Sequence, residues 1–390
     1  MAVLIDFQAY PVQRTLDILL MDRSTGNNII WATDPPPELA EITSDRKPIT
    51  MEQLRISGFE AIMPRMMKQS NEQQERTKKK GEVFTPAWIC CLMNNFLDED
   101  WFRRKSKLLF KVTGQTWESN PDPISFSQGR KWQTYVDSRR LEICCGEAPF
   151  LVSRYDASTG ELLPIEKRIG ILDRKLRIVD ENAEDEKEWV KWAKRAIQST
   201  YGYEYQGDNL LLARANVILS YAEYYERRWE RMPMDGTLRE IAEIISWNIW
   251  QMDGLKKTVP FGKPFQEAEQ ITMDLLLNDN KPEEAKPCMI QDWQGHTRHI
   301  FAKLREGAHP MKFDYVIGNP PYQEETESES TRMLPIYDKF MDAVYEAGRV
   351  VELITPARFL FDAGQTPKAW NKKMLDDPHI SVLYHNFHGI

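Results

Sequence analysis

The hydrophobic pattern of this chain alternates between helix-like and strand-like segments over most of its length. Apolar residues recur at helical spacing in segments of three or more turns. The helix-like segments are 84–102, 184–198, 208–231, 238–255 and 334–347, and we expect a further helix after Gly146. Shorter apolar runs between turn signals are typical of strands. The strand-like segments are 138–145, Tyr201 to Tyr205, 287–293, 313–318, 349–361 and 380–387. Strands that alternate with helices predict an α/β fold with a doubly wound, mostly parallel, Rossmann-like sheet.

The first part of the chain has a different pattern. Helix-like segments at 13–22 and 50–69 are separated by the turn at Pro35-Pro36-Pro37. We therefore expect a mainly helical N-terminal accessory region over residues 1–76. The charged connection RTKKKGE leads from it into a second domain at 77–390.

Polar residues follow each of the predicted strands. Glu142 and Gly146 follow the first strand, Glu204 ends the second, Asp292 the third and Asn319 the fourth. In a doubly wound sheet, ligands bind outside the carboxyl ends of the strands, near the point where strand order reverses. The sequence therefore predicts that these residues converge on one crevice.

The kind of ligand is constrained by two missing motifs. The chain has neither the G-x-G-x-x-G fingerprint nor the G-x-x-x-x-G-K-[ST] loop, so a nucleoside without a phosphate chain fits better. Glu204, at the end of a strand, is placed to accept hydrogen bonds from ribose hydroxyls. Asp173 competes for this role because it lies nearer the usual ~20 residues after the glycine turn. We favour Glu204, because a helix pattern opening near Asp208 follows it at once, whereas no clear helix follows Asp173.

The stretch FDYVIGNPPYQEETE, residues 313–327, carries the most specific chemistry. The exocyclic amine of adenine is a poor nucleophile because its lone pair is delocalised into the ring. The Asn319 side-chain carbonyl and the Pro320 backbone carbonyl can accept both amine hydrogens, and such preorganised dipoles contribute ~3 kcal/mol. Pro320 and Pro321 stiffen the turn, and Tyr322 can stack on a base that has left the duplex.

A second Pro-Pro corner follows Asp34 in NNIIWATDPPPEL. Some amino-methyltransferases use an Asp version of the catalytic corner, placed before the cofactor loop. Here Pro37 stands where the aromatic residue is needed, so nothing could stack on a base. We interpret this corner as a turn.

Composition places the chain among soluble globular proteins. It has 390 residues, 42% of them hydrophobic and 28% charged. The chain has no basic leader before its first apolar residues and no apolar run near the ~18 residues of a membrane helix, so we expect a cytoplasmic protein without a membrane contact. The cysteines lack zinc or disulfide spacings, and the His296/His299 and His385/His388 pairs are typical of surface residues. We therefore expect reduced thiols and no metal.

Charge is distributed unevenly. The net charge of -8 argues against a protein that coats nucleic acid indiscriminately. Residues 101–140 nevertheless combine nine Lys or Arg with Trp101, Trp117, Trp132 and Tyr135. This stretch could contact phosphates, and a solvated basic face is an equally good interpretation.

Taken together, these residues give the chain a resemblance to the adenine-N6 DNA methyltransferases of restriction-modification systems, over residues ~80–390. The resemblance is to the Asn-Pro-Pro-Tyr class, and it implies a type II or IIG-like modification methylase that uses S-adenosylmethionine, flips a base out of double-stranded DNA, and serves restriction-modification or another anti-phage system. GEVFTP is similar to the segment that contacts the methionine part of the cofactor, which implies this role for Phe84, Thr85 and Pro86.

The segment EICCGEAPFL, 142–151, is similar to the cofactor loop of this family, which commonly reads Asp-Pro-x-Cys-Gly-Ser-Gly-x-Phe-Leu. Cys145 and Gly146 match, Glu142 replaces the Asp, and Glu147 and Ala148 replace Ser and Gly. The resemblance further implies that Glu204 binds the ribose and that Asp292 lies near the adenine amine of the cofactor. It assigns catalysis to Asn319, Pro320, Pro321 and Tyr322.

The chain departs from the family pattern in one spacing and at its C-terminal end. The long spacing from Glu142 to Glu204 indicates an insertion near 154–185. No target-recognition domain is visible before Ile390, so we expect either a fragment of a longer protein or a specificity or nuclease subunit supplied in trans. No nuclease signature stands out in residues 1–76.

Two rival functions remain open at the level of sequence. The Asn-Pro-Pro-Tyr corner suits any planar amine or amide, so a protein glutamine or an RNA amine is an alternative substrate. The altered cofactor loop favours a second alternative, a non-catalytic DNA-binding or decoy relative.

Overall fold

The centre of the protein is a parallel sheet of five strands. The computed structural model describes residues 4–58, 62–68, 85–106, 108–126, 129–265, 286–306, 308, 310–324, 334–361, 363 and 365–384. The strand order is β11-β8-β3-β4-β5, and every neighbouring pair is parallel. The strands are β3 (Arg140–Ile143), β4 (Thr200–Glu204), β5 (Ile249–Gln251), β8 (Phe313–Gly318) and β11 (Gly348–Leu353). Strand order reverses between β3 and β8, which is where a doubly wound sheet binds its ligand.

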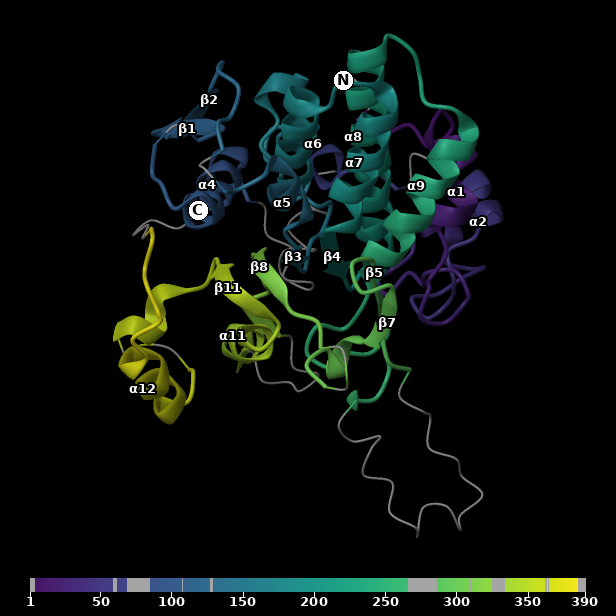
Figure 1. The fold of residues 1–390 in the computed structure, drawn as a ribbon. Helices are drawn as coiled ribbons and strands as arrows, with labels where there is room; N and C mark the ends of the chain where they lie inside the picture. The colour runs from purple at the N-terminus through teal and green to yellow at the C-terminus, as the bar shows by residue number, and fades with distance from the viewer. Residues whose placement is uncertain are drawn as a thin grey trace.

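Helices cover both faces of this sheet (Figure 1). One face carries α6 (Ile171–Asn182), α7 (Glu186–Gln198), α8 (Gly207–Trp229) and α9 (Asp235–Asn248). The other carries α11 (Tyr337–Tyr345). The mixed α/β architecture predicted from the alternating pattern is therefore present and is consistent with a Rossmann-like fold.

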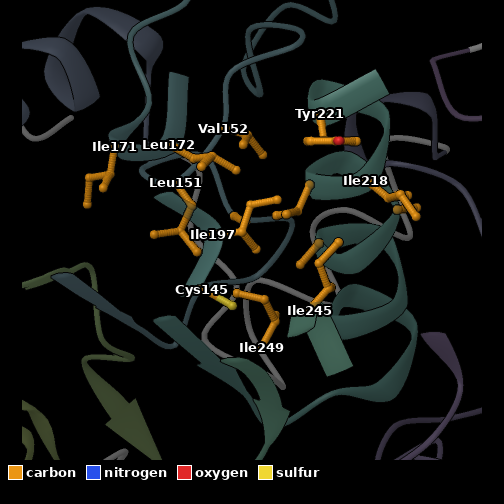
Figure 2. Close-up of a cluster of buried hydrophobic side chains, with 14 of the residues drawn as sticks. Cys145, Leu151, Val152, Ile171, Leu172, Ile197, Ile218, Tyr221, Ile245 and Ile249 are labelled. Atoms are coloured by element: carbon orange, nitrogen blue, oxygen red, sulfur yellow. The ribbon is translucent and has the colours of Figure 1, made fainter. Parts of the chain in front are cut away.

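The buried core divides along the two faces of the sheet. Leu141 and Ile143 of β3 join the cluster on the α11 side, whereas Ile249 and Ile317 belong to the larger cluster under α6 to α9. Figure 2 shows part of the larger cluster, where side chains from the loop after β3, from α6 and from α8 pack together. Every residue of β3 is buried, as expected for a strand covered on both faces.

A buried charge network fixes α4 (Ala87–Phe102) against the sheet. Asp98 accepts hydrogen bonds from Arg140 Nη1 at 3.0 Å and from Arg174 Nη1 at 2.6 Å. Tyr135, in α5 (Trp132–Asp137), also donates to Asp98 at 2.8 Å. Removing one partner from such a network leaves an uncompensated buried charge, so its members are held together strongly. Thr85 precedes α4, and the network therefore positions it relative to β3 and α6.

The N-terminal region contains only short helices among its described residues. These are α1 (Leu16–Leu19), α2 (Met51–Ile56), η1 (Val12–Arg14), η2 (Pro37–Leu39) and η4 (Arg65–Met67). A mainly helical region is thus not confirmed. The backbone of this region is hydrogen-bonded to the edge strand of the sheet. Gln251 of β5 donates to the Ile30 carbonyl and accepts from the Ile30 N–H, each within 2.9 Å.

Two predictions about strands are wrong. The segment around Asp292 is not a strand of the central sheet, because β6 (Met289–Asp292) pairs only with β7 (Thr297–Ile300), in an antiparallel hairpin. The third strand of the sheet is β5, which follows α9 without a loop. It lies inside the segment 238–255, where the helical periodicity runs on into the strand.

Other local predictions also need correction. The chain forms turns from Gly146 to Leu151, without the helix expected there. Asp173 lies in the first turn of α6, where it accepts from the Gly170 N–H at 3.2 Å, so it does not end a strand. Residues 380–384 form no strand, and 385–387 lie outside the described residues.

The remaining elements flank the sheet. They are β1 (Phe110–Thr113), β2 (Thr116–Ser119), η5 (Ile165–Lys167), η7 (Phe301–Lys303), β9 (Gln323–Glu324), β10 (Leu334–Pro335), η8 (Ala357–Phe361) and α12 (Lys368–Asp376). No helix in the described parts of the chain has the length and apolar character needed to cross a bilayer.

Candidate functional site at the carboxyl edge of the sheet

The turn after β3 forms one side of the site. Gly146 has a φ of +52°, a left-handed conformation that glycine adopts without steric cost. Its N–H donates to Glu204 Oε2 at 2.8 Å, which joins the end of β4 to the turn. Ala148 has a φ of +67°, although a residue with a Cβ is disfavoured there. The turn therefore keeps its shape at the position where the family commonly has a second glycine.

Two acids, Glu142 and Glu204, accept hydrogen bonds from the backbone of this turn. Glu142 accepts from the Leu151 N–H at 3.1 Å and is almost completely buried. Burial raises the pKa of the Glu142 carboxyl well above its ordinary value, against the opposing effect of the backbone N–H groups of Phe150 and Leu151. Glu204 accepts from Gly146 and also from the Gln206 N–H at 3.0 Å. Both acids thus position backbone at the edge of the sheet.

The Asn-Pro-Pro-Tyr corner leaves β8 beside this turn. Gly318, the last residue of β8, packs against β3 so closely that a Cβ would lie 2.5 Å from Ile143 Cγ1. The Asn319 amide is held at both ends, because Nδ2 donates to Thr85 Oγ1 at 3.2 Å and Oδ1 accepts from Tyr322 OH at 2.8 Å. The first residues after β8 are therefore fixed against both β3 and the start of α4.

Asn319 lies between two hollows. A cavity of about 60 Å³ extends towards the glycine turn and is lined by Thr85, Glu142, Gly146 and Asn319, among others. On the other side is a groove of about 1150 Å³, between α4 and β11, which Asn319 and Tyr322 also line. The smaller cavity is below the ~300–1,000 Å³ typical of small-molecule sites.

The structure brings most of the predicted site residues together. Cys145 and Gly146 line the small cavity with Glu142, Thr85 and Asn319. Glu204 reaches the same turn through its hydrogen bond to Gly146. Pro86 precedes α4, next to Thr85, and Pro320 and Pro321 follow Asn319. Phe84 lies outside the described residues.

Asp292 is not part of this group. Both of its carboxylate oxygens accept from Arg139 Nη2 at 3.0 Å. Arg139 precedes β3, so Asp292 lies at the amino edge of the sheet, opposite Asn319 and Gly146. The placement follows from its hairpin, because β6 pairs with β7 in a separate two-stranded sheet and is not one of the five parallel strands.

The acid that the structure does place at the carboxyl edge is Asp253. It follows β5 by two residues, and the intervening Met252 N–H donates to the Glu204 carbonyl at 2.9 Å. Asp253 accepts from the N–H groups of Leu255 and Lys256, at 3.1 and 3.0 Å. The signal for it in the sequence is the short apolar run Ile249-Trp250 immediately before Gln251-Met252-Asp253, which the helical pattern of α9 conceals.

Several residues of the small cavity were not predicted, and two of them lie far from Gly146 in the sequence. Asn209 lies in the first turn of α8, and Arg65 comes from the N-terminal region, far away in the sequence. Neither carries a motif, and only the folded chain brings them beside Gly146.

The basic and aromatic stretch at 101–140 lies away from this site. Trp101 is at the C-terminal end of α4, about 21 Å of helix from its start at a rise of 1.5 Å per residue. Its ring packs edge-on against Phe102 and Tyr135, with centroids 4.9 and 5.1 Å away. Arg140 is fully buried. Trp101, Tyr135 and Arg140 thus form packing contacts inside the fold. Other basic residues of the stretch are exposed, namely Arg103, Lys105, Lys111 and Lys131, so a contact with phosphates stays a prediction.

A parallel sheet of five strands with a polar site at the carboxyl edge is consistent with a Rossmann-like methyltransferase. The comparison with known families is specific about the class. Residues 198–389, slightly less than half of the chain, match the family described as Eco57I restriction-modification methylase. No curated protein and no solved structure matches the chain. The family match supports a DNA methyltransferase of a restriction-modification system.

Proposed function

We propose that this protein is an S-adenosylmethionine-dependent DNA methyltransferase that methylates the N6 amine of adenine in double-stranded DNA. The observation that carries the proposal is the position of Asn319, whose side chain lines both the cavity at the glycine turn and the large groove beside α4. A group in that position can contact a cofactor on one side and a substrate base on the other.

The carboxyl edge of the sheet carries side chains that suit the cofactor by their chemistry. Glu204 and Asp253, at the ends of adjacent strands, offer carboxylates for ribose hydroxyls and for an adenine amine. We assign to Asp253 the role near the cofactor's adenine amine that the resemblance implied for Asp292. Thr85, Pro86, Phe84, Cys145 and Gly146 keep the roles that the resemblance implies. The cofactor, when bound, supplies an electrophilic methyl group on a sulfonium.

The corner itself prepares the amine. Asn319 Oδ1 and the Pro320 carbonyl accept the two amine hydrogens, which returns electron density to the nitrogen as it attacks the methyl carbon. Oδ1 already accepts from Tyr322 OH, and a carbonyl oxygen has a second lone pair for the substrate. Thr85 holds the amide in this orientation through Nδ2. The Tyr322 ring stacks on the flipped base.

Asn319→Ala should abolish methyl transfer to plasmid DNA while S-adenosylmethionine still binds. The expected loss is at least about 10²-fold, as for other removed preorganised dipoles. The measurement is transfer from labelled cofactor to DNA, followed by identification of the methylated base by mass spectrometry, with cofactor binding measured by calorimetry. Asp34→Ala is the matched control, because exposed Asp34 precedes the other Pro-Pro corner, and it should leave transfer unchanged. Loss of cofactor binding in Asn319→Ala, or methylation of ribosomes or release factors in place of DNA, would contradict the proposal.

One observation favours a second candidate, a non-catalytic DNA-binding relative. The cavity at the glycine turn is small, and Ala148 and Glu147 replace residues that the family commonly has there. Calorimetry on the unmodified chain separates the two functions: DNA binding without any cofactor binding favours the non-catalytic candidate.

A further inference from the structure

A segment of the N-terminal region forms a wall of the small cavity. We call residues 62–68 the N-terminal strap. Its Arg65 lines the cavity together with Gly146 and Asn319, and as a residue it is only 6% exposed. Ile62, at the start of the strap, is buried in the large core cluster. The strap is thus an integral part of the site, although it lies outside the family match, which begins at residue 198.

The strap is tied to the site at two points. The Arg65 N–H donates to Glu147 Oε1 at 2.6 Å, and Tyr155 OH donates to the other oxygen of Glu147 at 2.5 Å. Farther along, Lys68 Nζ lies 3.4 Å from Asp208 Oδ2, and both side chains are buried. Glu147 belongs to the glycine turn and Asp208 to the start of α8. These contacts fix where Arg65 stands relative to the turn.

The charges around the cavity suit a ligand with a zwitterionic tail. Arg65 is the one lysine or arginine among the lining residues that the structure describes, whereas Glu142 and Glu147 supply carboxyl groups. The methyl donor of the proposed reaction carries an ammonium, a sulfonium and one carboxylate. A carboxylate that enters a site already lined by acids needs a cationic partner, because an unpaired buried charge is costly. A guanidinium matches a carboxylate with two parallel hydrogen bonds.

We propose that Arg65 is a cofactor-binding residue that pairs with the carboxylate of the amino-acid tail of the methyl donor. This inference rests on the proposed function. It means that the N-terminal region contributes directly to the cofactor site, beyond packing against the sheet.

The test compares two ligands within each variant. S-adenosylhomocysteine carries the amino-acid tail, and 5′-methylthioadenosine is the same nucleoside thioether without it. Calorimetry on the full chain gives the preference for the tailed ligand, which we define as the dissociation constant of 5′-methylthioadenosine divided by that of S-adenosylhomocysteine. In Arg65→Ala this ratio should fall by about tenfold to a hundredfold, the effect of losing a charge-assisted pair, while the affinity for 5′-methylthioadenosine changes little. Arg65→Lys should retain part of the preference because it keeps the charge.

Lys68→Met is the matched control for a purely structural role of the strap. It loosens the same segment and should weaken both ligands by a similar factor, so the ratio stays that of the unmodified chain. The ratio does not depend on the fraction of folded protein, so a destabilised variant still gives an answer. An unchanged ratio in Arg65→Ala overturns the inference and leaves the proposed function standing. If the unmodified chain binds neither ligand, the proposed function fails and the inference fails with it.

Discussion

The side chain of Asn319 uses its two ends differently. Its donor end is held by Thr85, which precedes α4, and its acceptor end by Tyr322, which follows β8. Because the two partners come from different elements, rotation of the amide would break both hydrogen bonds. The residues of this corner were identifiable from the sequence, because Asn-Pro-Pro-Tyr directly after a strand-like run is a specific motif, and their catalytic roles stay a proposal. The partner Thr85 was predicted for the cofactor, and its contact with Asn319 comes from the fold.

The large groove has a buried acid in its wall, Glu352. Glu352 of β11 is 9% exposed and lines the groove beside Ile89 and Met93 of α4. Burial raises the pKa of its carboxyl well above the ordinary value, and the negative charge of Glu99 acts in the same direction. The folded protein therefore favours the protonated acid, and ionisation of Glu352 opposes folding.

Glu352→Gln should make the stability of the protein less sensitive to pH. The folded-state pKa of Glu352 lies above the unfolded-state value, so its contribution is fully present below the unfolded-state pKa and is lost as pH rises towards the folded-state pKa. Between these two values the unmodified protein should lose about 1.4 kcal/mol per pH unit relative to the variant. Urea unfolding of both proteins from about pH 5 to about pH 8 measures this difference. Glu346→Gln, at an exposed position after α11, should run parallel to the unmodified protein, and a pH-independent effect of Glu352→Gln would refute the assignment.

At the scale of elements, the sequence predicts helices and strands that have a hydrophobic period of their own. It does not predict which strands pair with one another. The long helices α8 and α9, and the strands β3, β4, β8 and β11, have patterns of their own and were predicted. The strand β5 has three residues and follows α9 directly, so its apolar residues extend the helical pattern. The strand β6 has a strand pattern, but only its hydrogen-bond partner β7 shows that it forms a hairpin outside the sheet. Each error changed the list of candidate site residues by one acid. The error at β6 put Asp292 on the list, and the error at β5 left Asp253 off it.

The two acids should therefore respond differently to mutation. Asp253→Ala removes the carboxylate that follows β5 at the carboxyl edge of the sheet and should weaken S-adenosylhomocysteine binding by about tenfold, the effect of one hydrogen bond to a charged group. Asp292→Ala leaves Arg139 without its carboxylate partner, so it should lower the thermal midpoint and leave the dissociation constant unchanged. Calorimetry and thermal unfolding on the same samples measure both effects. The assignment of Asp253 fails if Asp292→Ala causes the larger loss of affinity.

At the scale of the whole molecule, the sheet draws on most of the chain. The family match begins at residue 198, yet β3 lies before it and pairs with both β4 and β8. The N-terminal region also supplies partners to buried groups of the matched part. Arg214 of α8 is fully buried and donates to the carbonyls of Leu19 and Met21 at 2.6 and 2.9 Å. The division into two domains at residue 76 stays a prediction. These contacts argue that the part after residue 76 needs the N-terminal region to fold.

A chain that starts at residue 59 should fail to fold stably. It would leave the Arg214 guanidinium without the Leu19 and Met21 carbonyls, and each lost partner of a buried charged donor costs about 1–3 kcal/mol or more. It would also expose the large core cluster, because Leu16, Leu19 and Trp31 are buried in it. We expect the shortened chain to be insoluble or to lack a cooperative thermal transition. Residues 1–58 supplied as a separate polypeptide should restore that transition, because the contacts are noncovalent. A shortened chain with the thermal midpoint of the full chain would instead show that this part is an accessory attached to an independent domain.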